Sequence, residues 1–186
     1  MKLAAISGSL RKKSFNTALL HTAVELAPQG VEIVAETIHG VPLYDADVEA
    51  SEGIPPKVAL LKDLIAGADG LILFTPEYNN SMPGVFKNAV DWLSTPSDDA
   101  DRVFKGKPVA LAGASRSGFG TILSQNAWLS VLRTLKTDTW FEGRLMISRA
   151  QTVFDADGKL TDEKTRQNLS DFIEGFAAYV AGRRQG

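Results

Sequence analysis

Short apolar runs alternate with amphipathic segments along the chain. The runs have the length of buried strands, and residues 31–36 are also rich in β-branched side chains. The segments between the runs repeat apolar residues at helical spacing. Val85, Phe86, Ala89, Val90 and Leu93 are one such set. Strands are therefore expected at residues 2–7, 31–36, 70–74 and 108–112, with a fifth inside 139–147 that is interrupted at Glu142 and Gly143.

Proline, glycine and capping residues give the expected bounds of the helices. Pro83 suits the first turn of the helix that follows residues 70–74, and Ser81 is expected to cap that helix. The other helices are expected at 16–27, 56–66, about 121–135 and 161–181, and residues 37–56 and 95–107 are predicted to be loops.

This alternation of strands and helices predicts an α/β protein with a parallel sheet. Five strands, each followed by a helix, favour the flavodoxin-like strand order 2-1-3-4-5. A chain of 186 residues is expected to form a single domain over residues 1–186. In this order the loops after strands 1, 3 and 4 meet at one edge of the sheet, where open parallel sheets bind ligands.

The loop after the first strand, residues 8–16, has the composition of a phosphate site. It offers the hydroxyls of Ser9 and Ser14, the guanidinium of Arg11, and backbone N–H groups that lead into a helix N-terminus. It lacks two of the three glycines of the dinucleotide fingerprint, and it lacks the GK[ST] ending of a P-loop. The alternative interpretation is a solvated basic turn between a strand and a helix.

The loop after the third strand contains Pro76-Glu-Tyr-Asn79, which supplies an aromatic ring, amide groups and exposed backbone. Such a mixture can border a flat heteroaromatic ligand. The alternative is a turn fixed by proline, with a tyrosine in the core. On the helix that follows, Lys87 and Asp91 are spaced four apart, which predicts an ordinary surface ion pair.

The loop after the fourth strand, residues 113–120, offers Ser115 and Arg116 as donors toward the same ligand. It lacks the final glycine of a hydrolase nucleophile elbow. His21 and His39, the two histidines of the chain, are not placed near Ser115 by sequence. We therefore expect no Ser-His pair, and we expect each histidine to have a surface or structural role.

Composition narrows the function classes further. The formal net charge is −2, from 22 acidic and 20 basic residues, and no basic stripe indicates a nucleic-acid partner. The absence of cysteine excludes disulfides, thiol catalysis and cysteine-ligated metals. The first residues do not resemble a signal peptide, and no apolar run has membrane-spanning length, so a cytoplasmic location is expected.

Residues 8–16, 75–84 and 87–92, together with Pro42-Leu-Tyr-Asp45, closely resemble the NADPH-dependent FMN reductase family. This flavodoxin-like group includes bacterial chromate and quinone reductases and some azoreductases. The resemblance covers nearly the whole chain in the same order and spacing. It differs at Arg116, where the family often has a small residue or proline.

The resemblance implies an FMN site with three parts. Ser9, Arg11, Ser14 and Asn16 would hold the phosphate, Pro76, Glu77, Tyr78 and Asn79 would flank the isoalloxazine, and Ser115, Arg116 and Gly118 would close the other side. It implies hydride transfer from NADPH or NADH to FMN and then to a quinone, an azo compound, a metal oxyanion such as chromate, or free flavin. The flavin carries this chemistry, so no side chain is expected to be catalytic and no metal is required.

The resemblance also implies a homodimer or homotetramer with the flavin site near the subunit boundary. Candidates for exposed interface aromatics are Trp92, Phe104, Phe119, Trp128 and Trp140, although ordinary core packing is at least as good an interpretation of each. Two other functions stay open: a flavodoxin-type electron carrier and a flavin-binding regulatory module. The sequence does not indicate the physiological acceptor or the choice between NADH and NADPH.

Overall fold

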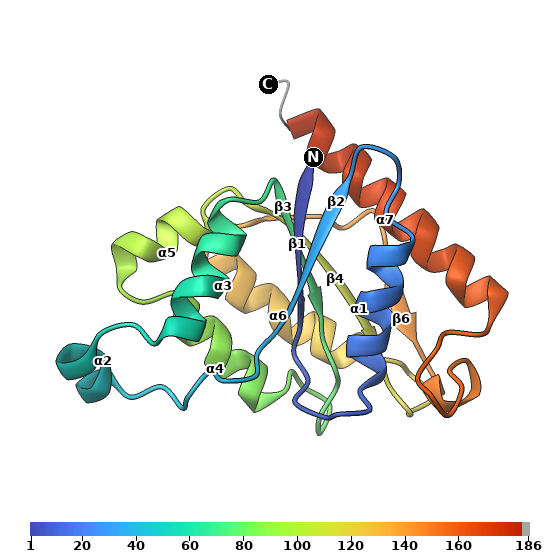
Figure 1. Ribbon diagram of the computed structural model, residues 1–186, viewed down its shortest axis with the longest axis horizontal. Coiled ribbons are helices and arrows are strands. Elements are labelled where there is room, and N and C mark those ends of the chain that lie inside the picture. The colour runs from blue at the N-terminus through green and yellow to red at the C-terminus, as the bar shows by residue number, and fades with distance from the viewer. Residues whose placement is uncertain (184–186) are drawn as a thin grey trace.

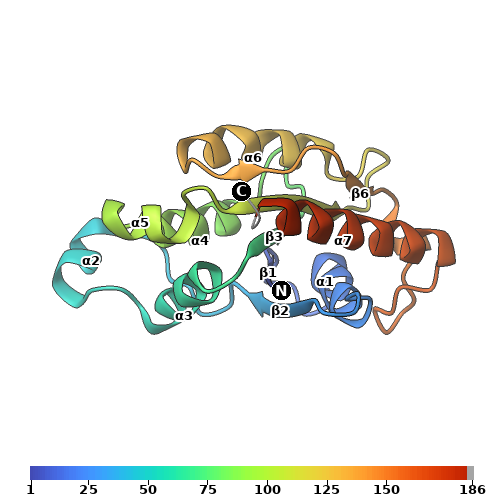
Figure 2. The same ribbon diagram turned by 90° about the horizontal axis from the view of Figure 1, so that it is seen from above.

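A computed structural model describes residues 1–183 of the 186-residue chain. Its centre is a parallel sheet in which neighbouring strands follow the order β2-β1-β3-β4-β5, with β6 also paired to β4. This confirms the predicted flavodoxin-like order. Figures 1 and 2 show the sheet as the middle layer, with helices on both of its faces. The strands are β1 (Lys2–Ser7), β2 (Glu32–Thr37), β3 (Gly70–Phe74), β4 (Pro108–Ala114), β5 (Asp138–Thr139) and β6 (Leu145–Ile147).

The helices divide between the two faces of the sheet. Figure 2 shows α1 and α7 on one face and α3, α4 and α6 on the other. The helices are α1 (Phe15–Glu25), α2 (Ala46–Glu52), α3 (Pro56–Ala66), α4 (Gly84–Leu93), α5 (Ser97–Phe104), α6 (Ile122–Thr134) and α7 (Glu163–Arg183), with a short 3₁₀ turn at Ala150–Thr152.

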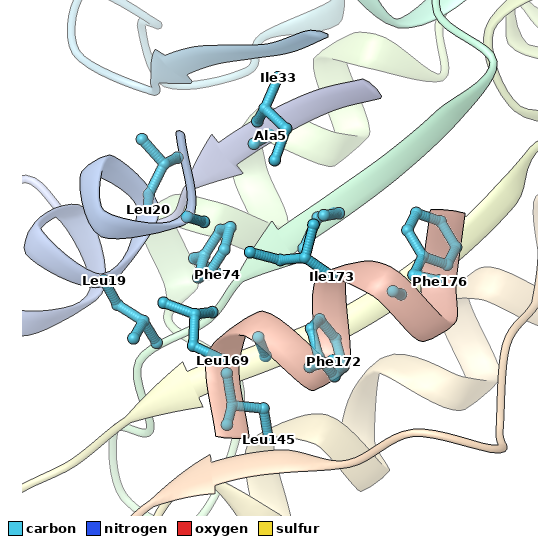
Figure 3. Packing of buried hydrophobic residues seen from close by; sticks show 14 of the residues in the cluster. Ala5, Leu19, Leu20, Ile33, Phe74, Leu145, Leu169, Phe172, Ile173 and Phe176 are labelled. Carbon is cyan, nitrogen blue, oxygen red and sulfur yellow. The ribbon is translucent and has the colours of Figure 1, made fainter. Parts of the chain in front are cut away.

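Each face of the sheet has its own apolar core. Leu3 and Ala5 of β1 point toward α1 and α7, whereas Ala4 and Ile6 point toward α3 and α4. Figure 3 shows the first of these cores, which combines Leu19 and Leu20 of α1 with Phe172 and Ile173 of α7. Because both faces are covered, the central strands are apolar at nearly every position. This explains why continuous apolar runs in the sequence predicted these strands.

Two segments predicted to be loops contain helices. The prediction was wrong for α2 because none of its residues is buried, so its sequence carries no helical apolar pattern. Local polar contacts hold it instead. Asp45 caps its N-terminus, and the Glu49 carboxylate accepts hydrogen bonds from the hydroxyls of Tyr44 (3.0 Å) and Thr95 (2.7 Å).

The second missed helix is α5. Only its last two residues, Val103 and Phe104, are buried, which is too few for a recognisable period. It is fastened by Lys62 of α3, whose side chain is 1% exposed and whose ammonium donates to Asp99 at 2.8 Å. Hydrogen bonds from Arg102 and Lys62 hold the pKa of the Asp99 carboxyl below its ordinary value. An ion pair between a buried lysine and a partly exposed aspartate therefore joins α3 to α5.

The fifth strand is interrupted where the sequence predicted. The two pieces, β5 and β6, each pair with β4, and the chain between them bends around Trp140. A Cβ on Gly143 would lie 2.1 Å from the Trp140 ring, so only glycine fits at this bend. Among residues 1–183 no helix combines the length and apolar character needed to cross a membrane.

Candidate functional site

The loops after β1, β3 and β4 meet around one cavity of about 220 Å³. Figure 1 shows these loops together at one end of the sheet. Nine of the eleven residues singled out in the sequence line the cavity, and Asn79 and Gly118 do not. The lining consists of Ser9, Arg11, Ser14, Phe15, Asn16, Pro76, Glu77, Tyr78, Ala114, Ser115 and Arg116.

The first loop is held by close packing at its start and by a cap at its end. A Cβ on Gly8 would lie 1.9 Å from the Phe86 ring, so the chain passes α4 at a distance that only glycine allows. Ser9 is buried and its hydroxyl accepts from the Arg11 N–H at 3.3 Å. Ser14 is the N-cap of α1 and accepts from the Thr17 N–H at 3.3 Å.

Positive charge gathers where this loop enters α1. The Arg11 side chain is exposed, and its guanidinium carbon lies 5.7 Å from the centre of the Phe15 ring. The N-terminus of α1 adds the partial positive charge of its dipole and the N–H groups of its first turn. A guanidinium, two serine hydroxyls and a helix N-terminus together provide the donors that a phosphate group needs.

Asn16 has a role that the sequence did not reveal. Its amide nitrogen donates to the Ala114 carbonyl at 2.9 Å, and its amide oxygen accepts from the Ala114 N–H at 2.9 Å. The side chain is 4% exposed, so both bonds are shielded from water. Asn16 therefore fastens the start of α1 to the end of β4, and only the second N–H of its amide is left for a ligand.

The second loop is a tight turn. Tyr78 and Ser81 exchange two backbone hydrogen bonds of 3.0 Å across Asn79 and Asn80. Both asparagines have positive φ, 50° and 61°, which is the conformation of a type I′ turn. The prediction that Ser81 caps α4 was wrong, because that helix begins at Gly84 with no side-chain cap. The turn leaves the Tyr78 ring 46% exposed at the mouth of the cavity.

Glu77 shapes the site from the opposite side. Its carboxylate accepts hydrogen bonds from the Leu123 N–H (2.9 Å) and the Ser124 N–H (3.1 Å) in the first turn of α6. Thr121 occupies the N-cap position of α6, but its side chain makes no capping hydrogen bond. The Glu77 carboxylate caps the helix instead, although it lies 46 residues before Leu123 in the sequence. The carboxylate also suits the positive end of the helix dipole.

Replacing Glu77 with alanine is expected to lower the free energy of unfolding by about 1–2 kcal/mol, the usual cost of losing an N-cap. Glu77→Gln keeps the acceptor oxygen and is expected to lose less than half as much. Urea denaturation followed by circular dichroism measures both values. Equal losses in the two variants would contradict the capping role.

A buried polar network supports the second loop. The Thr75 hydroxyl accepts from the indole N–H of Trp128 at 2.9 Å and contacts the Ser124 hydroxyl at 2.9 Å. Gly113 lies against it, since a Cβ there would be 2.3 Å from the Thr75 carbonyl oxygen. These contacts join β3, β4 and α6 directly behind the cavity. Their partners lie far apart in sequence, so no local pattern predicts them.

The third loop is anchored by the last strand. The Ser115 N–H donates to the Ile147 carbonyl at 2.9 Å, and the Ser115 carbonyl accepts from the Ala150 N–H at 3.0 Å. The Ser115 hydroxyl donates to Ser117 at 3.2 Å. Arg116 is exposed at the rim of the cavity, which places a second guanidinium beside the site.

His39 contacts the first loop from the turn that follows β2. Its Nε2 lies 3.1 Å from the Leu10 carbonyl oxygen, and its Nδ1 lies 3.1 Å from the Thr37 hydroxyl. A carbonyl only accepts, so Nε2 carries the proton in this contact. This agrees with the expected structural role. Neither histidine is among the residues that line the cavity with Ser115, as the sequence predicted.

The aromatic candidates fall into two groups. Trp92, Phe104, Trp128 and Trp140 are buried in the core, whereas Phe119 is 82% exposed beside the third loop. The surface interpretation is therefore wrong for four of the five. The predicted surface pair between Lys87 and Asp91 is present at 2.6 Å, with both side chains about 40% exposed.

Larger grooves are also present, and two of them border helices, although neither of these two is formed by all three loops. One of about 620 Å³ borders α1, and one of about 890 Å³ borders α7. Within residues 1–183 no three histidine, aspartate or glutamate side chains gather as metal ligands would. The three-loop cavity is therefore the place where fold and candidate chemistry coincide.

Comparison with known proteins places the chain in a family. The model of the NADPH-dependent FMN reductase family matches residues 1–152. An NAD(P)H-dependent FMN reductase of Pseudomonas aeruginosa is 42% identical over 180 residues, covering 97% of this chain and 95% of its own. A 2-hydroxy-1,4-benzoquinone reductase of a Burkholderia species is 39% identical over 184 residues, covering 99% and 98%.

Among solved structures, the flavoenzyme NAD(P)H:(acceptor) oxidoreductase of Paracoccus denitrificans superposes with a TM-score of 0.85. It is 34% identical, and the match covers 97% of each chain. The match thus includes β1, β3 and β4 and the three loops that follow them. The chain belongs to the NADPH-dependent FMN reductase family.

Proposed function

We propose that this chain is an FMN-dependent NAD(P)H oxidoreductase that reduces quinones. The observation that carries the proposal is the convergence of three loops on one cavity, in which the first loop supplies the donors of a phosphate site. Membership of the reductase family supports the same cofactor and the same reductant.

The residues at the first loop fit the phosphate of FMN. Ser9 and Ser14 offer hydroxyls from buried positions, Arg11 brings a fixed positive charge, and α1 directs N–H groups at the same point. Asn16 contributes its one remaining amide N–H and keeps the loop in place through Ala114. A Cβ at Gly8 would push this loop away from α4.

The rest of the cavity fits a flat ring at an open mouth. Its volume of about 220 Å³ is below the roughly 300 Å³ that encloses a small ligand, so part of the cofactor would lie at the mouth. Pro76, Glu77 and Tyr78 would flank the ring on one side, with Asn79 shaping the turn. Ser115 and Arg116 would border the other side, and Gly118 would lie farther out.

Bound FMN supplies the redox chemistry, because it accepts hydride from NAD(P)H and passes it to a second substrate. The three loops would hold that cofactor, and the open mouth beside Tyr78 would admit both substrates in turn. The cavity residues include neither histidine nor aspartate, and the Glu77 carboxylate is engaged by the N–H groups of α6, so no general base is assigned. Quinones are the proposed acceptors, in line with the benzoquinone reductase relative. Azo compounds, chromate and free flavin would be alternative acceptors.

The proposed assembly is a homodimer or a homotetramer. Residues 1–186 are proposed to form one domain, and the proposed location of the protein is the cytoplasm. Tyr78, Phe119 and Leu123 expose apolar surface near the mouth of the cavity, at 46%, 82% and 42%. A second subunit over this area would shield the surface and narrow the approach to the flavin.

Steady-state oxidation of NADH or NADPH tests the proposal, with FMN-loaded protein and 1,4-benzoquinone as acceptor. The expected result is turnover well above that of the same concentration of free FMN. Comparing the two nicotinamides in this assay also determines the preferred reductant. Rates that match free FMN with every acceptor would contradict the proposed enzyme and favour an electron carrier or a regulatory module.

A further inference from the structure

A second groove adjoins the phosphate end of the proposed FMN site. Its volume is about 620 Å³, and it shares Arg11, Ser14 and Phe15 with the smaller cavity. One wall is the outer face of α1 and the other is the segment 151–159, which Figure 1 shows beside α1. Nothing in the proposed reaction uses this groove.

The end of the groove nearest the first loop is basic. Lys12 and Lys13 line it there, and the opposite wall, residues 151–159, adds Lys159 to the lining of the groove. None of the ion pairs found among residues 1–183 includes any of these three lysines. Three ammonium groups without acidic partners favour a phosphate-bearing ligand.

The acidic residues of the groove do not cancel this charge. The Asp155 carboxylate accepts from the N–H groups of Asp157 (3.0 Å) and Lys159 (2.8 Å) and so stabilises its own turn. Glu25 pairs with Arg166 at 3.6 Å at the far end of the groove. Among the acidic side chains that line the groove, only the exposed carboxylate of Asp157 makes no such contact.

The middle of the groove offers apolar and hydrogen-bonding surface that suits a nucleobase and a ribose. Phe15 lies against Phe154 with ring centres 5.3 Å apart, and Ala18 continues the apolar floor along α1. His21 follows one turn later with a ring that can donate or accept a hydrogen bond. From Ser14 to Glu25 the helix face is roughly 16 Å long, at 1.5 Å per residue.

We propose that this groove binds the adenosine monophosphate half of FAD, so that the site accepts FAD as well as FMN. The inference rests on the proposed function, because the flavin phosphate must lie at the N-terminus of α1. A second phosphate joined to the first would then lie beside Lys12 and Lys13, and the adenosine would follow the floor formed by Phe15 and Ala18. Nicotinamide must instead reach the ring end beside Tyr78, so continuity with the phosphate end favours the flavin dinucleotide.

Calorimetric titration of the flavin-free chain with FMN and with FAD tests the proposal. The key variant is Lys159→Glu, which lies outside the smaller cavity, and the matched control is Arg133→Glu in the last turn of α6. The chain is expected to bind FAD at least as tightly as FMN. Lys159→Glu is expected to weaken FAD about tenfold and leave FMN unchanged, because it reverses one phosphate contact.

Added AMP is expected to compete with FAD and not with FMN. The inference is wrong if FMN binds but FAD does not, or if Lys159→Glu leaves the ratio of the two affinities unchanged. It is also wrong if that variant raises KM for NADPH alone, since the groove would then hold the other dinucleotide. Failure of FMN itself to bind would refute the proposed function, which distinguishes the two failures.

Discussion

Asn16→Ala is expected to lower the free energy of unfolding by about 2–5 kcal/mol and to weaken FMN binding as well. The substitution leaves the buried N–H and carbonyl of Ala114 without partners, and each unsatisfied group costs about 1–3 kcal/mol. The contact joins α1 to β4 across 98 residues of sequence, so its loss also separates the first loop from the third. Urea denaturation gives the stability, and flavin fluorescence titration gives the affinity.

Two companion variants make this prediction specific. Asn126→Ala removes an exposed asparagine from α6 and is expected to change stability by less than about 0.5 kcal/mol. Asn16→Asp keeps the acceptor for the Ala114 N–H but sets a carboxylate against the Ala114 carbonyl, so it is expected to destabilise as well. A stable Asn16→Ala protein with unchanged FMN affinity would show that this contact supports neither the fold nor the site.

Arg11→Ala is expected to weaken FMN binding about 10- to 100-fold, because it removes a charge-assisted contact of roughly 1.5–3 kcal/mol. The guanidinium is exposed at the edge of the cavity, so the stability of the flavin-free protein is expected to stay the same. Arg11→Lys keeps the charge but loses the two-pronged geometry, and an intermediate affinity is expected.

Arg133→Ala is the matched control, since it removes the same charge from the last turn of α6 at the other end of the sheet. It is expected to leave the FMN affinity unchanged. The salt dependence of binding provides a second check, because losing a phosphate contact flattens it. An Arg11→Ala protein that binds FMN as well as the parent would remove the phosphate assignment of the first loop.

The sequence predicted the elements that build both cores and missed those that do not. β1, β3 and α3 have the bounds expected from their apolar runs, because burial selects apolar residues at regular spacing. The two missed helices, α2 and α5, bury little, and polar contacts such as Glu49 with Thr95 hold them. The pattern of apolar positions along a sequence carries no information about such polar contacts.

The same distinction applies to the site. Loop composition and strand order were sufficient to bring Ser9, Pro76 and Ser115 to one cavity. The hydrogen-bond partners of Asn16 and Glu77 could not be predicted, because they lie 98 and 46 residues away in sequence and come close only in the folded chain. The turn at Asn79 and Asn80 could have been predicted, because two consecutive asparagines are a recognised signal for positive φ.

The most direct test of the phosphate assignment compares FMN with riboflavin, which has the same ring system but no phosphate. Both are titrated into the flavin-free protein at low salt, and quenching of flavin fluorescence gives each Kd. FMN is predicted to bind at least about 100-fold more tightly, because charge-assisted contacts at the first loop require the phosphate. Equal affinities for the two flavins would contradict the assignment of residues 8–16 as the phosphate site.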